Sequence, residues 1–199
     1  MPPQSIISRP VYGMLSPQPG REHLFVADAQ GAEAILDMAA AAPDGFFAGA
    51  QIVYIPRDAD PSLAERLKAL SPAMFYEGPS VAAAMPRLRQ TLATARMGLR
   101  VYLAGTEGLI GQAMQAALEA GIDHSSIQTE HRGSLARRVQ CVHCKGITED
   151  VTTQPVTCAH CGLLLFVRDH YSRRIAAFQG VCINAEDPSE IPPAEEAFR

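Results

Sequence analysis

Short apolar runs alternate with longer amphipathic stretches over the first two thirds of the chain. The apolar runs have the length and composition of buried strands, and they span 23–29, 50–56, 73–78, 99–106 and 125–131. Amphipathic segments with helical spacing follow them at 30–43, 62–70, 80–98 and 107–121. This alternation predicts an α/β fold with an open parallel sheet and helices on both faces.

The pattern changes near both ends and again after residue 132. The first 22 residues hold five prolines and little periodicity, which predicts an extended arm over 1–22 before an α/β lobe over 23–132. Residues 133–180 contain short strand-like runs and paired cysteines, and they predict a small β-rich module. Residues 181–199 form an acidic tail with several prolines, which we expect to be mobile or wrapped on a surface.

Four of the five cysteines form the pattern C-x2-C-x13-C-x2-C, and these are Cys141, Cys144, Cys158 and Cys161. A gap of two residues lets both thiolates of a pair converge on one ion, so two such pairs predict a tetrahedral site of four sulfurs. Zn²⁺ suits this site, and so does a mononuclear iron of the rubredoxin type. We favour Zn²⁺ because most ribbons with so short a loop hold zinc for structure, and iron remains the alternative.

Charge sets the cysteine segment apart from the rest of the chain. The formal net charge is −4 and the pI is about 5.8, which gives no general attraction for nucleic acid or anionic membranes. Residues 131–174, however, carry seven Lys and Arg against three Asp and Glu. This basic segment favours a docking surface for a partner, and it leaves a nucleic-acid-binding zinc ribbon as an alternative.

Hydropathy indicates a protein that stays in the cytoplasm. The sequence has no apolar run near the roughly 18–20 residues that span a bilayer. The start, "MPPQSIISRPVYG", lacks the charged beginning, apolar stretch and cleavage site of a signal peptide. Because cytoplasmic thiols stay reduced, the paired cysteines are interpreted as metal ligands rather than disulfides.

Residues 101–131 resemble the nucleotide-binding lobe of ferredoxin–NADP reductase-type proteins. In that family a strand runs into a Cys-Gly-Pro turn, a helix follows, and a closing strand ends in Glu-x-aromatic. Here the turn reads Ala104-Gly105-Thr106 and the closing strand ends in Glu130-His131-Arg132. The sequence "DAQG" (28–31) stands where the family has its first glycine-rich turn, and Arg57 where its members often place an arginine that contacts phosphate. The resemblance implies a vestigial nucleotide site at Gly105, Thr106 and Arg57.

The departures from that family favour a different use of the lobe. Ala104 replaces the cysteine that lies near the hydride path in the reductases, and only about 22 residues precede the first strand, where the family has its flavin-binding barrel. Turns with so few glycines also hold pyrophosphate poorly. We therefore expect a scaffold or docking lobe that transfers no hydride, with residual nucleotide binding as the alternative.

The lobe, the four cysteines and the run "VRDHYSRRIAAFQGV" (167–181) together resemble the family of small DmmA-type subunits of bacterial dimethylamine monooxygenases. The resemblance implies a subunit of an NAD(P)H- and O₂-dependent complex that converts dimethylamine to methylamine and formaldehyde. It also implies a haem-containing oxygenase subunit and a flavin reductase subunit as partners, which carry the haem and the flavin. This chain would be a scaffold or an electron relay without catalytic residues of its own. A stand-alone rubredoxin-like electron carrier is a further alternative.

Overall fold

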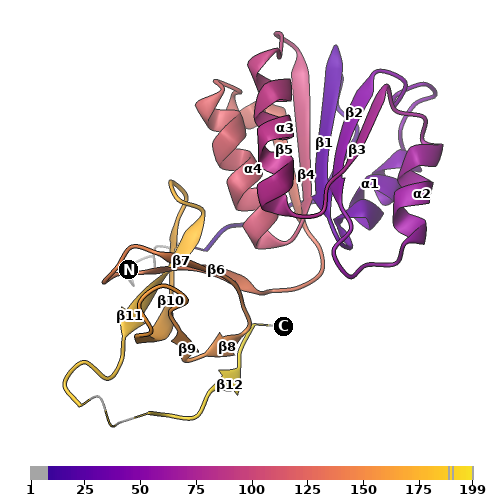
Figure 1. Cartoon of the computed structure of the whole chain (residues 1–199). Helices are drawn as coiled ribbons and strands as arrows, with labels where there is room; N and C mark the ends of the chain where they lie inside the picture. The colour runs from indigo at the N-terminus through magenta and orange to yellow at the C-terminus, as the bar shows by residue number, and fades with distance from the viewer. Residues whose placement is uncertain (1–8, 188, 190, 199) are drawn as a thin grey trace, which may run out of the picture. The chain divides into compact units, whose positions relative to one another are not determined.

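The computed structural model describes residues 9–187, 189 and 191–198, and it divides into two compact units (Figure 1). Tyr12–Gly133 form the lobe, and the described residues from 134 onward, together with residues 9–11, form the cysteine module. The expected arm and acidic tail include residues 1–8, 188, 190 and 199, which lie outside the described residues.

The lobe is built on a parallel sheet of five strands in the order β3-β2-β1-β4-β5 (Figure 1). Its strands are β1 Glu22–Asp28, β2 Ala50–Ile55, β3 Met74–Glu77, β4 Leu99–Gly105 and β5 Ile127–His131. The helices that connect them are α1 Gly31–Ala39, α2 Ser62–Ala69, α3 Val81–Ala93, α4 Glu107–Glu119 and the short 3₁₀ helix η1 His124–Ser126. The predicted α/β fold, with an open parallel sheet followed by a β-rich cysteine region, is confirmed.

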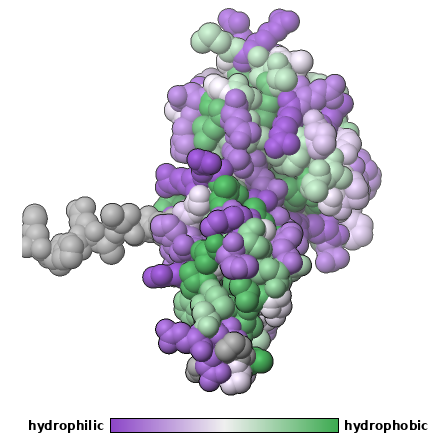
Figure 2. Space-filling model, turned by 60° about the vertical axis from the view of Figure 1, so that its left-hand side comes forward, coloured by the Kyte–Doolittle hydropathy of each residue, from purple (hydrophilic) through white to green (hydrophobic). Residues whose placement is uncertain are grey.

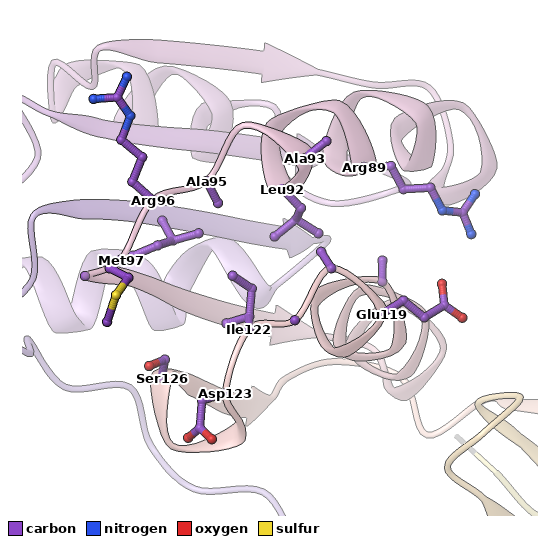
Figure 3. Close-up of a pocket in the computed structure, with 15 residues that line it drawn as sticks. Arg89, Leu92, Ala93, Ala95, Arg96, Met97, Glu119, Ile122, Asp123 and Ser126 are labelled. Carbon is purple, nitrogen blue, oxygen red and sulfur yellow. The ribbon is translucent and has the colours of Figure 1, made fainter.

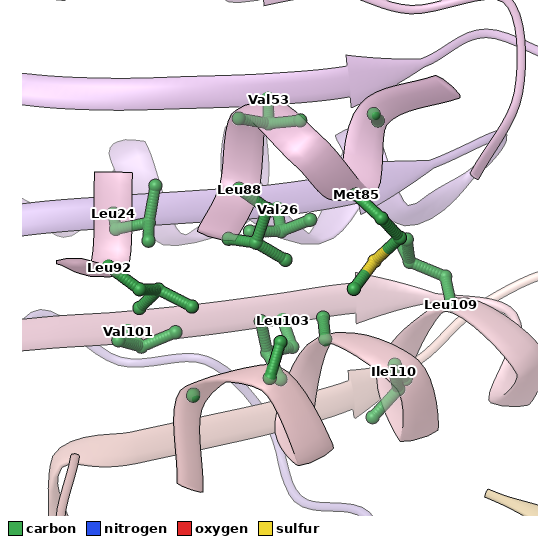
Figure 4. Packing of buried hydrophobic residues seen from close by; sticks show 14 of the residues in the cluster. Leu24, Val26, Val53, Met85, Leu88, Leu92, Val101, Leu103, Leu109 and Ile110 are labelled. Atoms are coloured by element: carbon green, nitrogen blue, oxygen red, sulfur yellow. The ribbon is translucent and has the colours of Figure 1, made fainter. Parts of the chain in front are cut away.

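Helices cover both faces of this sheet because its strands are apolar on both sides. On one face, Leu88 of α3 and Leu109 of α4 pack with Leu103 of β4 in one buried cluster (Figure 4). On the other face, Ile35 of α1 and Leu67 of α2 belong to a second cluster that includes strand residues of β1, β2 and β4. The sheet is therefore the middle layer of three.

Several element ends differ from the predicted ones, and hydrogen bonding explains the differences. The helix expected over 30–43 ends at Ala39, where the chain tightens into turns closed by bonds such as Ala41 N–H to the Met38 carbonyl. The strand expected over 125–131 begins at Ile127, because Asp123 caps the preceding 3₁₀ turn by accepting from Ser125 N–H.

The lobe begins with an irregular segment that lies beside β5, the strand at one end of the sheet. Gly13 N–H donates to the Thr129 carbonyl at 2.9 Å, and Leu15 N–H donates to Glu130 Oε2 at 2.7 Å. The Leu15 side chain is buried in the same cluster as α1 and α2. This segment, which the sequence placed in an arm, thus contributes Leu15 to the lobe core.

The cysteine module contains a sheet in the order β7-β6-β11-β10-β9 and a separate β8–β12 pair. Its strands are β6 Arg137–Cys141, β7 Ile147–Val151, β8 Thr153–Gln154, β9 Val156–Thr157, β10 Leu164–Ser172, β11 Ala177–Cys182 and β12 Glu195–Glu196. Within the described part of the acidic tail, β12 pairs with β8 and the Phe198 side chain is buried. The end of the tail is therefore part of the module, which the sequence did not predict.

Candidate metal centre and the carboxyl edge of the lobe sheet

The two cysteine pairs sit in two turns with the same backbone hydrogen bonds. In the first turn, Lys145 N–H donates to the Cys141 carbonyl at 3.0 Å and Cys141 N–H donates to the Gly146 carbonyl at 2.9 Å. In the second turn, Gly162 and Leu163 make the matching bonds to Cys158 at 3.0 and 2.9 Å. The residue after each second cysteine has a positive φ, 63° at Lys145 and 74° at Gly162. This repeated bend turns both sulfurs of each pair the same way.

The four predicted sulfurs converge on one point. The Sγ atoms of Cys141 and Cys161 lie 3.8 Å apart and those of Cys144 and Cys158 lie 3.7 Å apart; all four are within 4.8 Å of one another. An ion bound at about 2.3 Å by four tetrahedral sulfurs sets them about 3.8 Å apart. All five cysteines of the chain are free thiols, so this spacing is not that of a disulfide. The arrangement fits a tetrahedral metal ion.

Electrostatics also favours a cation at this point. Burial alone would raise the pKa of the Cys158 thiol, but N–H groups of Cys161 and His160 point at its sulfur and lower the pKa to about 6. Leu163 N–H similarly favours the thiolate of Cys161, yet burial and the neighbouring sulfurs raise its pKa to about 12. Four thiolates this close need a positive ion among them.

The two halves of the centre differ in exposure. Cys141 and Cys158 are buried, Cys161 is partly buried and Cys144 is exposed. The histidine inside the second pair does not join the sulfurs, because His160 Nε2 lies 2.8 Å from the Ile147 carbonyl oxygen. Among the described residues, the group that could hold this metal consists of the four cysteines alone. One edge of the centre therefore lies at the protein surface.

Much of the predicted basic segment is neutralised by nearby carboxylates. Arg132 pairs with Glu130 at 2.6 Å in the lobe. In the cysteine module, Arg138 pairs with Glu149 at 2.8 Å. Arg137 also pairs with a carboxylate there, which is that of Asp169. The charge excess seen in the sequence is thus not a continuous field of free cations.

The three residues predicted for a nucleotide do meet, and they surround Asp28. Arg57 Nε donates to Asp28 Oδ2 at 2.7 Å, Thr106 N–H donates to Oδ1 at 2.7 Å, and Thr106 Oγ1 donates to Oδ2 at 2.7 Å. Gly105 has a φ of 124°, and a Cβ at this position would overlap the Asp28 carboxylate. Sequence reasoning placed Asp28 in the turn 28–31 but gave it no role, although an acid near the end of the apolar run 23–29 was a visible signal.

Comparison with known families gives one matching domain for each of the two units. Residues 4–127 match the family described as dimethylamine monooxygenase subunit DmmA-like, N-terminal domain, and residues 138–181 match its C-terminal domain. This chain belongs to the DmmA-like family.

Similar proteins include one curated relative and two solved reductases. Over 110 residues the DmmA-like chain is 37% identical to the heme-dependent oxidative N-demethylase delta subunit of Ectopseudomonas mendocina (strain ymp), which covers 55% of this chain and 63% of the relative. Phthalate dioxygenase reductase is 13% identical with a TM-score of 0.45, covering 72% of this chain and 47% of that one. The ferredoxin reductase of carbazole 1,9a-dioxygenase is 16% identical with a TM-score of 0.40, covering 57% and 38%.

A cavity of about 590 Å³ lies between the carboxyl-terminal ends of α3 and α4 (Figure 3). It is at the amino-terminal edge of the lobe sheet, opposite the edge that holds Asp28. Leu92 and Ile122 are among its apolar lining residues. The charged groups of Arg89, Arg96 and Glu119 point away from its centre (Figure 3). Without convergent polar groups, this cavity has no feature that would orient a nucleotide.

Tyr54 next to the Asp28 turn gives a prediction on pH dependence. Its buried hydroxyl donates to the Ala29 carbonyl at 3.1 Å, and burial, followed by the charge of Asp28, raises the pKa of Tyr54 to about 12. An unfolded tyrosine titrates near 10. The contribution of Tyr54 to stability is therefore complete below pH ~10 and is lost as pH rises through about 12.

Tyr54→Phe should lower the free energy of unfolding by about 1 kcal/mol at neutral pH, because the Ala29 carbonyl loses its donor. Urea unfolding of both proteins between pH 7 and pH ~11 measures this. The variant should lose less stability than the wild type on the alkaline side. Equal alkaline losses in the two proteins would contradict the assignment.

Within the part of the chain that the structure describes, no helix is long and apolar enough to cross a bilayer.

Proposed function

We propose that this chain is a subunit of a multi-component, NAD(P)H- and O₂-dependent dimethylamine monooxygenase, which oxidatively N-demethylates dimethylamine to methylamine and formaldehyde. The match of both units to the DmmA-like domains carries this proposal. The similarity to the curated relative, a subunit of a heme-dependent oxidative N-demethylase, supports it over the 63% of that relative that aligns. In this proposal haem and flavin belong to a haem-containing oxygenase subunit and a flavin reductase subunit.

Within that complex, we assign the four cysteines to one bound Zn²⁺ that holds the module together. The sulfur separations of 3.7 and 3.8 Å support a tetrahedral ion, and zinc requires no redox partner to fill that role. The module has a small core, with eight buried residues in its main cluster, so it depends on the ion for folding energy. The ion would leave no open coordination position for chemistry on the amine.

The role of this chain would then be to hold the redox partners. Apolar side chains reach the surface of the cysteine module, among them the exposed Leu135, Phe166 and Ile191. Figure 2 shows apolar and hydrophilic residues interspersed over one face of the molecule. A cavity of about 640 Å³ lies beside the second cysteine turn and is lined by His143, Leu163 and Cys182 among others. Surfaces of this kind commonly take part in protein contacts.

Reconstitution tests the proposed function. A tagged chain should co-purify the haem and flavin subunits, and the complex should consume NAD(P)H and O₂ only when dimethylamine is present. Omitting this chain should reduce amine-dependent NAD(P)H consumption to background. Adding back wild type should restore it, whereas Cys144→Ser, which lacks one of the four sulfurs, should not. Full activity without the chain would refute an essential role.

An electron relay through a rubredoxin-like iron is the second candidate function. The exposed Cys144 favours it, because an ion at the protein surface lies within reach of a partner's redox centre. The purified protein would then be red, contain one iron per chain and bleach on reduction. A colourless protein with one zinc per chain would eliminate this candidate, as a carrier acting alone or as a relay in the complex.

A further inference from the structure

The lobe sheet reverses its strand order between β1 and β4, and its crevice is closed at that point. In sheets of this kind, ligands bind outside the carboxyl ends of the two strands that flank the reversal. Here Gly31, at the start of α1, packs directly on the end of β4, and a Cβ on Gly31 would overlap the Ala104 carbonyl. The two turns that would part around a pyrophosphate therefore touch each other through their backbones.

The groups that would bind phosphate at this edge already bind a carboxylate. Asp28 is fully buried, and both its oxygens accept bonds of 2.7 Å from Thr106 and Arg57. Thr106 is the N-cap of α4, so the carboxylate lies at the positive end of that helix dipole. An arginine, a helix N-terminus and a glycine without a side chain to obstruct the approach are the parts of a phosphate site. Here all three surround Asp28.

We propose that the Asp28 carboxylate is a built-in substitute for a nucleotide phosphate, and that the lobe consequently binds no pyridine dinucleotide at this edge. A phosphate approaching this point would meet a buried negative charge, to which the two Thr106 donors and Arg57 Nε already bond. The sequence left two roles open for the lobe, a scaffold or docking role and residual nucleotide binding. This inference favours the scaffold or docking role. In the proposed complex, the NAD(P)H site would then lie on a partner subunit.

The first test is direct binding to the full-length wild-type chain. Titration with NADPH, NADH and inorganic pyrophosphate, followed by calorimetry and by NADPH fluorescence, should show no saturable binding up to about 1 mM. Saturable NADPH binding that Arg57→Gln weakens would overturn the inference. No partner subunit is present, so the result is independent of the proposed demethylase role.

The second test asks whether an external anion can replace the carboxylate. Asp28→Gly removes the side chain and leaves space for an anion, and it should lower the melting temperature by roughly 10 °C. Millimolar pyrophosphate should then raise the melting temperature of the variant more than that of the wild type, compared with NaCl at equal ionic strength. If Asp28→Gly does not fold alone, its yield on refolding with and without pyrophosphate gives the same comparison.

Asp123→Gly is the matched control. Asp123 also accepts bonds at the start of a helical turn, but it is the exposed N-cap residue of η1, and its donors within the described part of the chain are the N–H and Oγ of Ser125. Pyrophosphate should stabilise this variant no more than the wild type. If pyrophosphate raises the melting temperatures of the Asp28 and Asp123 variants equally, or raises neither, Asp28 is a structural carboxylate only. Either result would overturn the proposal that Asp28 replaces a phosphate.

Discussion

Replacement of Cys144 by serine is expected to release the metal ion and to unfold the cysteine module while the lobe stays folded. Three sulfurs remain after this change, and a serine hydroxyl is a poor ligand for a site made of thiolates. Structural zinc supplies roughly 10–16 kcal/mol of folding energy in small zinc-binding units. The main buried cluster of the module contains two of the ligands themselves, Cys141 and Cys158, so its packing depends on the same ion.

Two measurements on the purified chain check this prediction. Elemental analysis should fall from one metal ion per chain to none, and hydrogen exchange should lose protection over residues 137–175 while β1 and β4 keep theirs. Cys182→Ser is the control, because this partly buried thiol contacts Asn184 at 3.5 Å and does not belong to the four-sulfur group. A Cys144→Ser protein that loses its metal yet keeps protection in β6 and β10 would show that the ion does not hold the fold.

The two units are stabilised by different interactions, so different changes should unfold each of them. The lobe buries large apolar clusters on both faces of its sheet, so it has a core of its own. If the four cysteines hold an ion as proposed, the module relies on that metal, on short strands and on contacts of its chain ends such as the buried Phe198. Removing the metal from a reconstituted complex should therefore abolish docking through the module and leave docking through the lobe intact.

The layered fold of the lobe could be predicted because its information is local. Leu24 and Val26 lie in one apolar run, and residues of α3 and α4 repeat at helical spacing, so strand and helix follow from neighbours in the sequence. Strand order could not be predicted in this way. The pairing of β1 with β4 joins Val26 to Leu103, and nothing near either residue specifies the other.

The candidate metal centre was predictable for a similar reason, since each cysteine pair is a local motif with a known bend. The Asp28 site was not, because it joins residues 28, 57 and 106, which meet only after β1, β2 and β4 have assembled. The family resemblance left residual nucleotide binding open as an alternative at the point where these residues meet. The structure places the Asp28 carboxylate at this point. Whether the point holds a nucleotide phosphate or a side chain of the protein therefore depends on that one carboxylate.

Long-range contacts also explain why the pairing near the end of the chain was not predicted. Acidic composition and prolines made residues 181–199 resemble a tail that is mobile or wrapped on a surface. Two residues of β12 are too few for a periodic pattern, so its pairing with β8 left no signal in the sequence. Phe198 is buried because Arg137, far earlier in the chain, offers it a flat partner.

Arg137→Ala is expected to destabilise the cysteine module by about 2–4 kcal/mol. The guanidinium of Arg137 lies between two aromatic rings, 4.1 Å from the centre of Phe178 and 4.0 Å from that of Phe198. The side chain is only 9% exposed, and its Nη2 donates to Asp169 at 2.8 Å. Alanine would remove both stacked contacts and leave space between the rings.

The pH profile distinguishes the loss of the ion pair from the loss of packing. Burial alone would raise the pKa of Asp169, but hydrogen bonds from Arg9 and Arg137 lower it overall. The contribution of this carboxylate to stability is thus complete above its unfolded pKa near 4 and is lost as pH falls through the lower folded pKa. Arg137→Ala should therefore flatten the acid side of the stability profile, in addition to lowering it at neutral pH.

The exposed neighbour Arg168 supplies the control, because Arg168→Ala removes the same type of charge next to Asp169 without emptying a buried site. Its effect should stay within about 0.5 kcal/mol in urea unfolding of the metal-bound protein. The double variant Arg137→Ala/Phe198→Ala should cost less than the sum of the single variants, since both remove one stacked contact. Additive losses would mean that Phe198 is held by the β8–β12 pairing rather than by Arg137, and the C-terminal residues would then be fixed by backbone bonds alone.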